Sequence, residues 1–134
     1  MERITEGRTI TETDLVMFSY FTGDWTFLHT DAEASRSSVF GERVAHGYLT
    51  LSVSLGLAIR SGAINPNNFI ALRSIENVRF LKPVKIGDTL KVAYSSSRQV
   101  GESNRARVTI DARTTNQRDE VVLEFRTMHY ENEK

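Results

Sequence analysis

The segment Gly23–Asp31, with the sequence GDWTFLHTD, contains side chains that could carry out acid–base chemistry. Asp24 and His29 are five residues apart, and the aromatic residues Trp25 and Phe27 lie between them. An aspartate is ionised and a histidine is largely neutral at pH 7, because their ordinary pKa values are about 3.9 and 6.5. Either side chain can therefore accept a proton. We expect the segment to be an irregular loop, in which both side chains can point into one pocket.

One reaction that such a pair could serve is the addition of water to an α,β-unsaturated thioester. It needs two proton carriers and a hydrogen-bond donor for the enolate oxygen. Asp24 and His29 could be the carriers, and the residues alone leave their assignment open. Backbone N–H groups in the first turn of a helix lack internal partners and lie at the positive end of its dipole. Gly47 has no side chain to block a substrate carbonyl, so its amide is the predicted oxyanion hole.

These residues must be positioned by the elements around the most apolar segment, Val44–Ile59. Its sixteen residues include no charge, although 25% of the chain is charged. As a helix it would be about 24 Å long, short of the roughly 20 residues that a bilayer requires. A buried strand is the alternative, but the length favours a helix. Because apolar residues occur on every face, we expect the helix to be surrounded by protein.

The remaining chain predicts two small helices before the apolar helix and strands after it. Asp14–Phe21 and Ala32–Ser37 are the expected helices. Arg105–Arg113 alternates apolar and polar residues, as does the segment around Val92, and Val121–Tyr130 is the last expected strand. Short turns make the strands antiparallel. The predicted fold is a single α+β domain, residues 1–134, in which a sheet of four strands curls around the central helix.

Composition excludes several function classes. Seventeen Lys and Arg residues balance seventeen Asp and Glu residues, so no overall charge attracts nucleic acid or an anionic membrane. The absence of cysteine excludes disulfides and thiolate chemistry. The three histidines lack metal-ligand spacing, so we expect no metal site. The polar N-terminal residues do not form a signal peptide, and we expect a cytoplasmic protein.

Three motifs resemble those of the MaoC-like dehydratases, also called (R)-specific enoyl-CoA hydratases. They are Gly23–His29, Ala45-His46-Gly47, and a strand and turn formed by Arg79–Val84 and Ile86–Thr89. The resemblance covers the chain from about Ile10 to Thr127. It implies a hot-dog fold and an enzyme of fatty acid metabolism that hydrates 2-enoyl-CoA or dehydrates 3-hydroxyacyl-CoA. The family's acid and histidine act on one water molecule. The resemblance therefore implies that Asp24 and His29 are catalytic, with a preference for His29 deprotonating water and Asp24 handling the α-proton, and that the Gly47 amide is the oxyanion hole.

Two positions in the segment Gly23–His29 differ from the family motif. Thr26 replaces an asparagine and Phe27 replaces a proline. Thr26 and His46 are expected to support the loop. The expected substrate-binding residues are those that could line an acyl pocket or meet the nucleotide of coenzyme A: Trp25, Phe27, Phe40, Tyr48, Leu55, Arg79 and Lys82. The two basic residues could equally be a solvated strand edge. No cofactor is expected, because the acyl-CoA or acyl-pantetheine is the substrate.

Exposed strand edges and an incompletely covered apolar face predict a homodimer. Two alternative functions remain. A hot-dog thioesterase usually has a carboxylate on the central helix, whereas Val44–Ile59 has none and Glu42 is the nearest. A non-catalytic subunit that binds acyl thioesters would keep the fold without the reaction.

Overall fold

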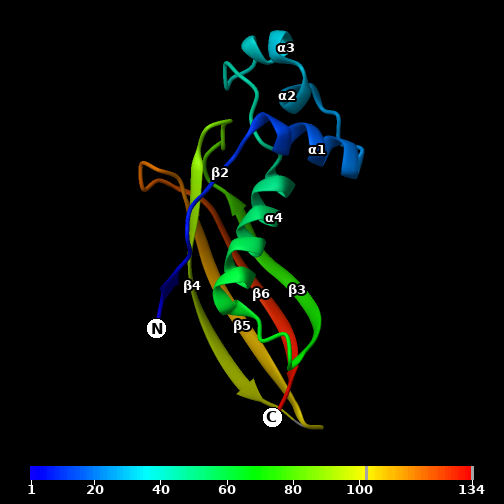
Figure 1. Cartoon of the computed structure of the whole chain (residues 1–134), viewed down its shortest axis with the longest axis vertical. Coiled ribbons are helices and arrows are strands. Elements are labelled where there is room, and N and C mark those ends of the chain that lie inside the picture. Colours follow the sequence, from blue (N-terminus) through cyan, green and yellow to red (C-terminus); the bar gives the residue numbers. More distant parts are fainter. Residues whose placement is uncertain (102, 134) are drawn as a thin grey trace.

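A long helix lies across one face of a strongly curved antiparallel sheet (Figure 1). The computed structural model describes residues 1–101 and 103–133. The sheet order is β1-β4-β5-β6-β3, and the short strand β2 also pairs with β4. The strands are β1 (Arg3–Ile4), β2 (Arg8–Thr9), β3 (Phe69–Phe80), β4 (Thr89–Val100), β5 (Arg105–Thr115) and β6 (Val121–Asn132). All pairings are antiparallel. The predicted fold class, an antiparallel sheet around one helix, is confirmed.

The central helix α4 (Gly47–Ala58) packs on the concave face of the sheet. Leu49 and Leu57 are buried in the same core as Val92 of β4. The hydroxyl groups of Ser54 and Thr114 form a buried hydrogen bond of 2.7 Å between helix and sheet. Small residues on α4 therefore allow close contact with the strands, and the polar groups at this contact are satisfied by one another.

The helix differs from the prediction in its start and in its exposure. Residues 44–46 are extended, because the Val44 amide donates to Leu28 O (2.9 Å) and the Ala45 amide donates to Val84 O (2.7 Å). The helix consequently begins at Gly47 rather than at Val44. It continues after Ala58 into a π-helical turn, η1 (Ile59–Ala63). The expectation of complete burial is wrong for this chain, since Tyr48 is 70% exposed.

Three helices gather at the N-terminal end of α4 (Figure 1). They are α1 (Glu12–Thr22), α2 (Phe27–Thr30) and α3 (Ala32–Arg36). Thr11 and Asp14 form a capping box at the start of α1, and Gly23 ends it with φ of 84°, a conformation that favours glycine. The expected loop after Gly23 contains one helical turn, α2, which the sequence analysis missed. These helices carry the candidate catalytic residues to one end of the sheet.

Among the described residues, no helix combines the length and apolar character needed to cross a membrane.

Candidate active site

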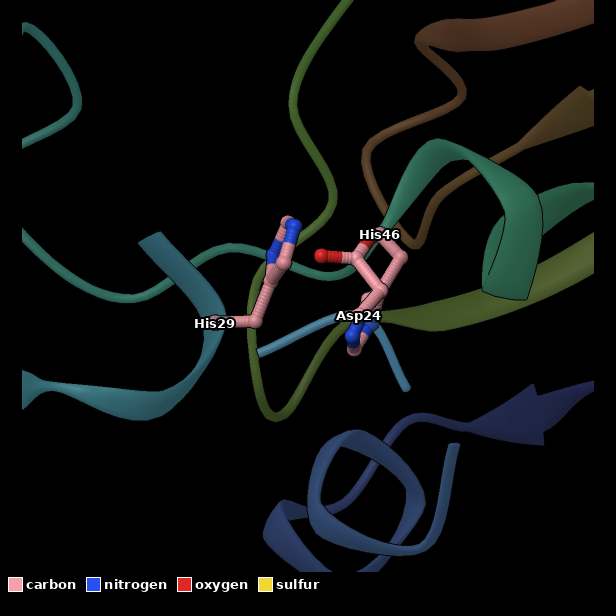
Figure 2. A group of neighbouring side chains, drawn as sticks. All are labelled: Asp24, His29 and His46. Atoms are coloured by element: carbon pink, nitrogen blue, oxygen red, sulfur yellow. The ribbon is translucent and has the colours of Figure 1, made fainter. Parts of the chain in front are cut away.

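Asp24, His29 and His46 come together from three different segments (Figure 2). Asp24 directly follows the glycine that ends α1, His29 lies on α2, and His46 is the N-cap residue of α4. One polar atom from each side chain lies within 4.8 Å of the other two. The proximity of Asp24 and His29 expected from their spacing is thus present in the structure, and His46 joins them.

The ring of His29 is held by a backbone carbonyl. Its Nδ1 lies 2.7 Å from Val44 O. A carbonyl oxygen can only accept, so Nδ1 must carry the hydrogen, and in the neutral ring Nε2 keeps its lone pair. The Val44 carbonyl therefore selects the tautomer that a general base requires, with Nε2 as the atom that accepts a proton. The extended backbone before α4 makes this carbonyl available.

The carboxylate of Asp24 is held by Thr26. Both the Thr26 hydroxyl (2.6 Å) and the Thr26 amide (3.1 Å) donate to Asp24 Oδ1. These two hydrogen bonds, the hydroxyl first, lower the pKa of Asp24 below its ordinary value, and the nearby histidines lower it slightly further. Asp24 is therefore ionised at neutral pH. Thr26 thus fixes one carboxylate oxygen of Asp24.

We expect Thr26→Val to raise the pKa of Asp24 toward its ordinary value. The variant removes the stronger of two hydrogen bonds to the ionised form, so the carboxylate protonates at a higher pH than in the wild type. The carbon-13 NMR titration of the Asp24 carboxyl measures this directly. Thr26→Ser keeps the hydroxyl and should titrate like the wild type. Identical titrations of the valine variant and the wild type would contradict the assignment.

His46 is buried beneath His29. It is 1% exposed, and its Nε2 lies 2.9 Å from the hydroxyl of Ser19 on α1. The two imidazole rings are stacked, with centroids 3.8 Å apart and planes inclined by 24°. Burial, and then the neighbouring His29, lowers the pKa of His46, so its ring stays neutral. His46 therefore has a different environment from that of the partly buried His29.

Aspartate and histidine side chains such as these three also bind metal ions in some proteins. The orientation of the two imidazole rings, however, argues against a metal site here. A metal ion binds in the plane of each imidazole, at about 2.1 Å from nitrogen. The ring planes of His29 and His46 are inclined by only 24°, with centroids 3.8 Å apart. The two planes therefore meet much farther from the ring nitrogens than a metal–nitrogen bond extends. In this arrangement, one ion cannot be bound well by both histidines. The geometry suits a water or substrate atom held by Asp24 and His29 better than it suits a metal.

A groove opens beside the first turn of α4. Its volume is about 410 Å³, and its lining is mostly apolar. Gly47 lies at the helix start, where the His46 side chain makes no capping hydrogen bond. An ideal Cβ on Gly47 would lie 3.0 Å from the Phe80 ring, so glycine is needed for this close approach. The groove is lined by Phe40, Val44, Ala45, Gly47, Thr50, Phe80, Leu81, Lys82, Pro83 and Val84.

Some of the predicted substrate-binding residues line this groove, and others do not. Phe40 and Lys82 line the groove, and Lys82 also forms an ion pair of 2.8 Å with Glu120. Arg79 does not line it. Arg79 borders a separate hollow, together with Asp111.

The remaining residues expected in the acyl pocket also lie outside the lining. Trp25 and Phe27 are about half exposed, at 51% and 48%, and Trp25 packs edge-on against Tyr20. Tyr48 on α4 is 70% exposed, and Leu55, two turns further along, packs against the core. The aromatic loop therefore does not by itself form a closed acyl pocket in this chain.

Sequence reasoning missed three contributors to the site. Ser19 bonds to His46, the Val44 carbonyl orients His29, and Phe80 covers Gly47. Ser19 gave one weak signal, a small polar residue inside an apolar helix. The other two act through a backbone carbonyl and through a contact between strand β3 and α4. Phe80 belongs to the family-like segment Arg79–Val84, but that segment does not indicate its contact with Gly47.

Comparison with known proteins shows the family to which the chain is similar. The family model of the MaoC-like domain matches residues 2–121. Protein MaoC of Klebsiella aerogenes is 41% identical over 103 residues, which cover 77% of this chain but only 30% of that protein. The (R)-specific enoyl-CoA hydratase of Rhodospirillum rubrum is 31% identical over 111 residues, covering 75% of this chain and 72% of that enzyme.

A solved structure is similar over the whole chain. The structure described as a monoamine oxidase regulatory protein from Archaeoglobus fulgius has a TM-score of 0.94 and 34% identity, and the match covers 100% of this chain and 90% of that one. The structural neighbours confirm the hot-dog fold. Relatives with this fold thus carry both enzymatic and regulatory names.

Proposed function

The chain belongs to the MaoC-like dehydratase family, and from this premise we propose that it adds water to the double bond of a 2-enoyl thioester, or removes water in reverse. The observation that carries the proposal is the pairing of an ionised Asp24 with a His29 whose Nε2 is free to accept a proton. The name of the R. rubrum relative supports the (R)-specific reaction and a coenzyme A thioester as substrate. A thioester on an acyl-pantetheine arm has the same reacting group. No cofactor is required by this chemistry.

The lowered pKa of Asp24 supports one assignment of the two roles. An ionised carboxylate has no proton to give, so in hydration Asp24 orients the water by accepting one of its hydrogens. His29 Nε2 removes the other hydrogen as the water oxygen bonds to the β-carbon. The protonated ring then returns this proton to the α-carbon. This differs from the preference stated from the sequence, in which Asp24 handled the α-proton.

Distances and dipoles support this scheme. A water molecule can bridge two acceptors that are up to about 5.6 Å apart, at about 2.8 Å from each. One carboxylate oxygen of Asp24 and one ring nitrogen of His29 lie within 4.8 Å of each other. Electrons displaced from the double bond accumulate on the thioester oxygen, where the Gly47 amide and the helix dipole of α4 would stabilise them.

Crotonyl-CoA tests the proposal against its alternatives. Loss of the enoyl absorbance without thiol release is the expected result. Release of free coenzyme A would instead indicate a thioesterase, and tight binding without turnover would indicate a non-catalytic subunit. Chiral analysis of the product should give the (R)-3-hydroxyacyl thioester. The match to a protein described as regulatory makes the non-catalytic subunit the stronger alternative.

We expect Gly47→Ala to lower kcat/KM about tenfold or more while the protein remains folded. The added methyl would lie 3.0 Å from Phe80 Cζ and would displace this half-exposed ring into the groove beside the amide. Gly56→Ala is a matched control, because a Cβ there meets nothing within 4 Å. It should stabilise α4 by about 0.5–1 kcal/mol without loss of activity. Equal activities in both variants would count against an oxyanion role for Gly47.

The homodimer remains part of the proposal. Strand β3 pairs only with β6 among the described strands, which leaves its other edge open. Leu72 on this strand is 54% exposed, and Ile75 is 37% exposed. An open edge with apolar side chains favours pairing with a second copy. Analytical ultracentrifugation should give twice the chain mass of 15.2 kDa, and Leu72→Lys should give the monomer. A stable wild-type monomer at micromolar concentration would contradict the dimer.

A further inference from the structure

His46 is the most deeply buried of the three clustered side chains, Asp24, His29 and His46, yet its hydrogen bonding is incomplete. Its Nε2 is paired with Ser19, which is fully buried. Its Nδ1 makes no hydrogen bond of good geometry in the described part of the chain, although the Asp24 backbone lies near enough to favour the protonated ring. An unpaired buried polar atom costs stability, and an apolar side chain of similar size would avoid that cost. The retention of an imidazole at this position therefore requires a reason beyond packing.

The contacts of His46 point to His29. The two rings face each other at 3.8 Å, while Phe18 packs edge-on against His46 at 4.9 Å between ring centroids. Helix α1 thus holds His46 through Phe18 and Ser19, and His46 in turn supports one face of the His29 ring. The bond from His29 Nδ1 to Val44 O fixes the ring at one atom, but rotation about that bond stays possible. A flat neighbour in contact with the ring face removes this freedom.

We propose that His46 and Ser19 are positioning residues, which fix the ring plane of His29 so that its Nε2 is directed at the bound water. This inference rests on the proposed function, because it assigns His29 as the base. A base that deviates by about 1 Å can lose about 10²-fold in rate. The stack therefore has a catalytic consequence, although neither residue touches the substrate.

The neutrality of His46 also fits this role. During the reaction His29 becomes positively charged, and a second charged imidazole at 3.8 Å would oppose this. Burial and the neighbouring ring keep His46 neutral. A neutral aromatic face instead stabilises an adjacent cation. The burial of His46 beneath His29 thus supports both the position and the charged state of the base.

Substitutions can separate the ring from its hydrogen bond. His46→Phe keeps a flat ring against His29 but loses the bond to Ser19. His46→Gln keeps a polar partner for Ser19 but loses the stack. We expect kcat for crotonyl-CoA to fall about 10²-fold in His46→Gln and less than tenfold in His46→Phe, with KM within about twofold of wild type in both. Ser19→Ala should lower kcat about tenfold. Ser54→Ala, which also removes a buried serine bond, is the control and should change neither constant.

Nitrogen-15 NMR of the His29 ring supplies a readout that does not depend on activity. The wild type should show hydrogen on Nδ1 and a single sharp Nε2 signal. His46→Gln and Ser19→Ala should keep hydrogen on Nδ1, because Val44 O still accepts it, but should shift or broaden the Nε2 signal as the ring gains freedom to rotate. Wild-type kcat and an unchanged His29 spectrum in these variants would overturn the inference, as would equal losses in His46→Gln and His46→Phe. If the His46 variants fail to fold, Ser19→Ala alone decides. If the wild type does not hydrate crotonyl-CoA, the proposed function fails, and the spectra still test the stack.

Discussion

Asp24→Asn is expected to lower the hydration of crotonyl-CoA by about 10³-fold or more, with little change in the fold. The amide has the same shape as the carboxylate, and its oxygen can still accept the two hydrogen bonds from Thr26. It carries no charge, however, so it holds the water weakly and does not stabilise the histidine cation that forms as water loses its proton. Acid–base groups in such positions contribute roughly 10²–10⁴-fold to rate.

The same segment offers a matched control for this variant. Asp31 caps α3 by accepting from the Ala34 amide at 2.9 Å, and asparagine is an equally good N-cap residue. Asp31→Asn therefore removes a nearby negative charge without loss of the cap, and we expect its activity to stay within twofold of wild type. The two variants, Asp24→Asn and Asp31→Asn, are compared by their steady-state rates and their melting temperatures. An Asp24→Asn enzyme with more than a tenth of the wild-type rate would refute the role of the carboxylate.

The large elements could be predicted because their patterns are local. The alternation in Arg105–Arg113 appears as the alternating burial of β5. The uncharged segment before Ile59 forms the central helix, although its start was wrong by three residues. The start is set by hydrogen bonds from residues 44 and 45 to Leu28 and Val84. These partners are 16 and 39 residues away in the chain, so no pattern within Val44–Ile59 indicates them.

The placement of Arg79 illustrates a second limit. Its basic charge, and its place near Pro83 on the strand where relatives approach the ligand, suggested contact with the nucleotide at the pocket mouth. Strand β3, however, changes register between Glu76 and Arg79. Asn77 in this interval has φ of 55°, a left-handed conformation. Such an irregularity changes which side chains face each side of a sheet. A strand pattern cannot reveal it, so the direction of Arg79 was not predictable.

The reactive residues of the candidate site could be predicted from the sequence, but the groups that hold them in position could not. Asp24 and His29 could be selected because they occupy the positions of the acid and the histidine in the family motif that Gly23–His29 resembles. The groups that hold them are a carbonyl, a hydroxyl and a stacked ring, contributed by Val44, Thr26 and His46. These are common groups whose role depends only on where the fold places them. The sequence can therefore indicate reactive residues more readily than the residues that orient them.

His29→Asn is expected to remove catalysis while keeping the architecture of the site. The asparagine Nδ2 can replace His29 Nδ1 as the donor to Val44 O, whereas His29→Ala would leave this part-buried carbonyl without its donor, at about 1 kcal/mol of stability. Neither variant has a group that accepts a proton from water. We expect both to lose about 10³-fold in rate or more, with the asparagine variant closer to wild type in melting temperature.

The double variant Asp24→Asn/His29→Asn tests whether the two side chains act on a single water molecule. Residues that act as one unit show strongly non-additive effects, so the double variant should be little slower than either single variant. Binding of crotonyl-CoA, measured by calorimetry, should survive in all three, because none of the substitutions fills the groove beside Gly47. Multiplicative losses would mean that Asp24 and His29 serve separate steps. Unchanged turnover in His29→Asn would remove the base from the proposed reaction.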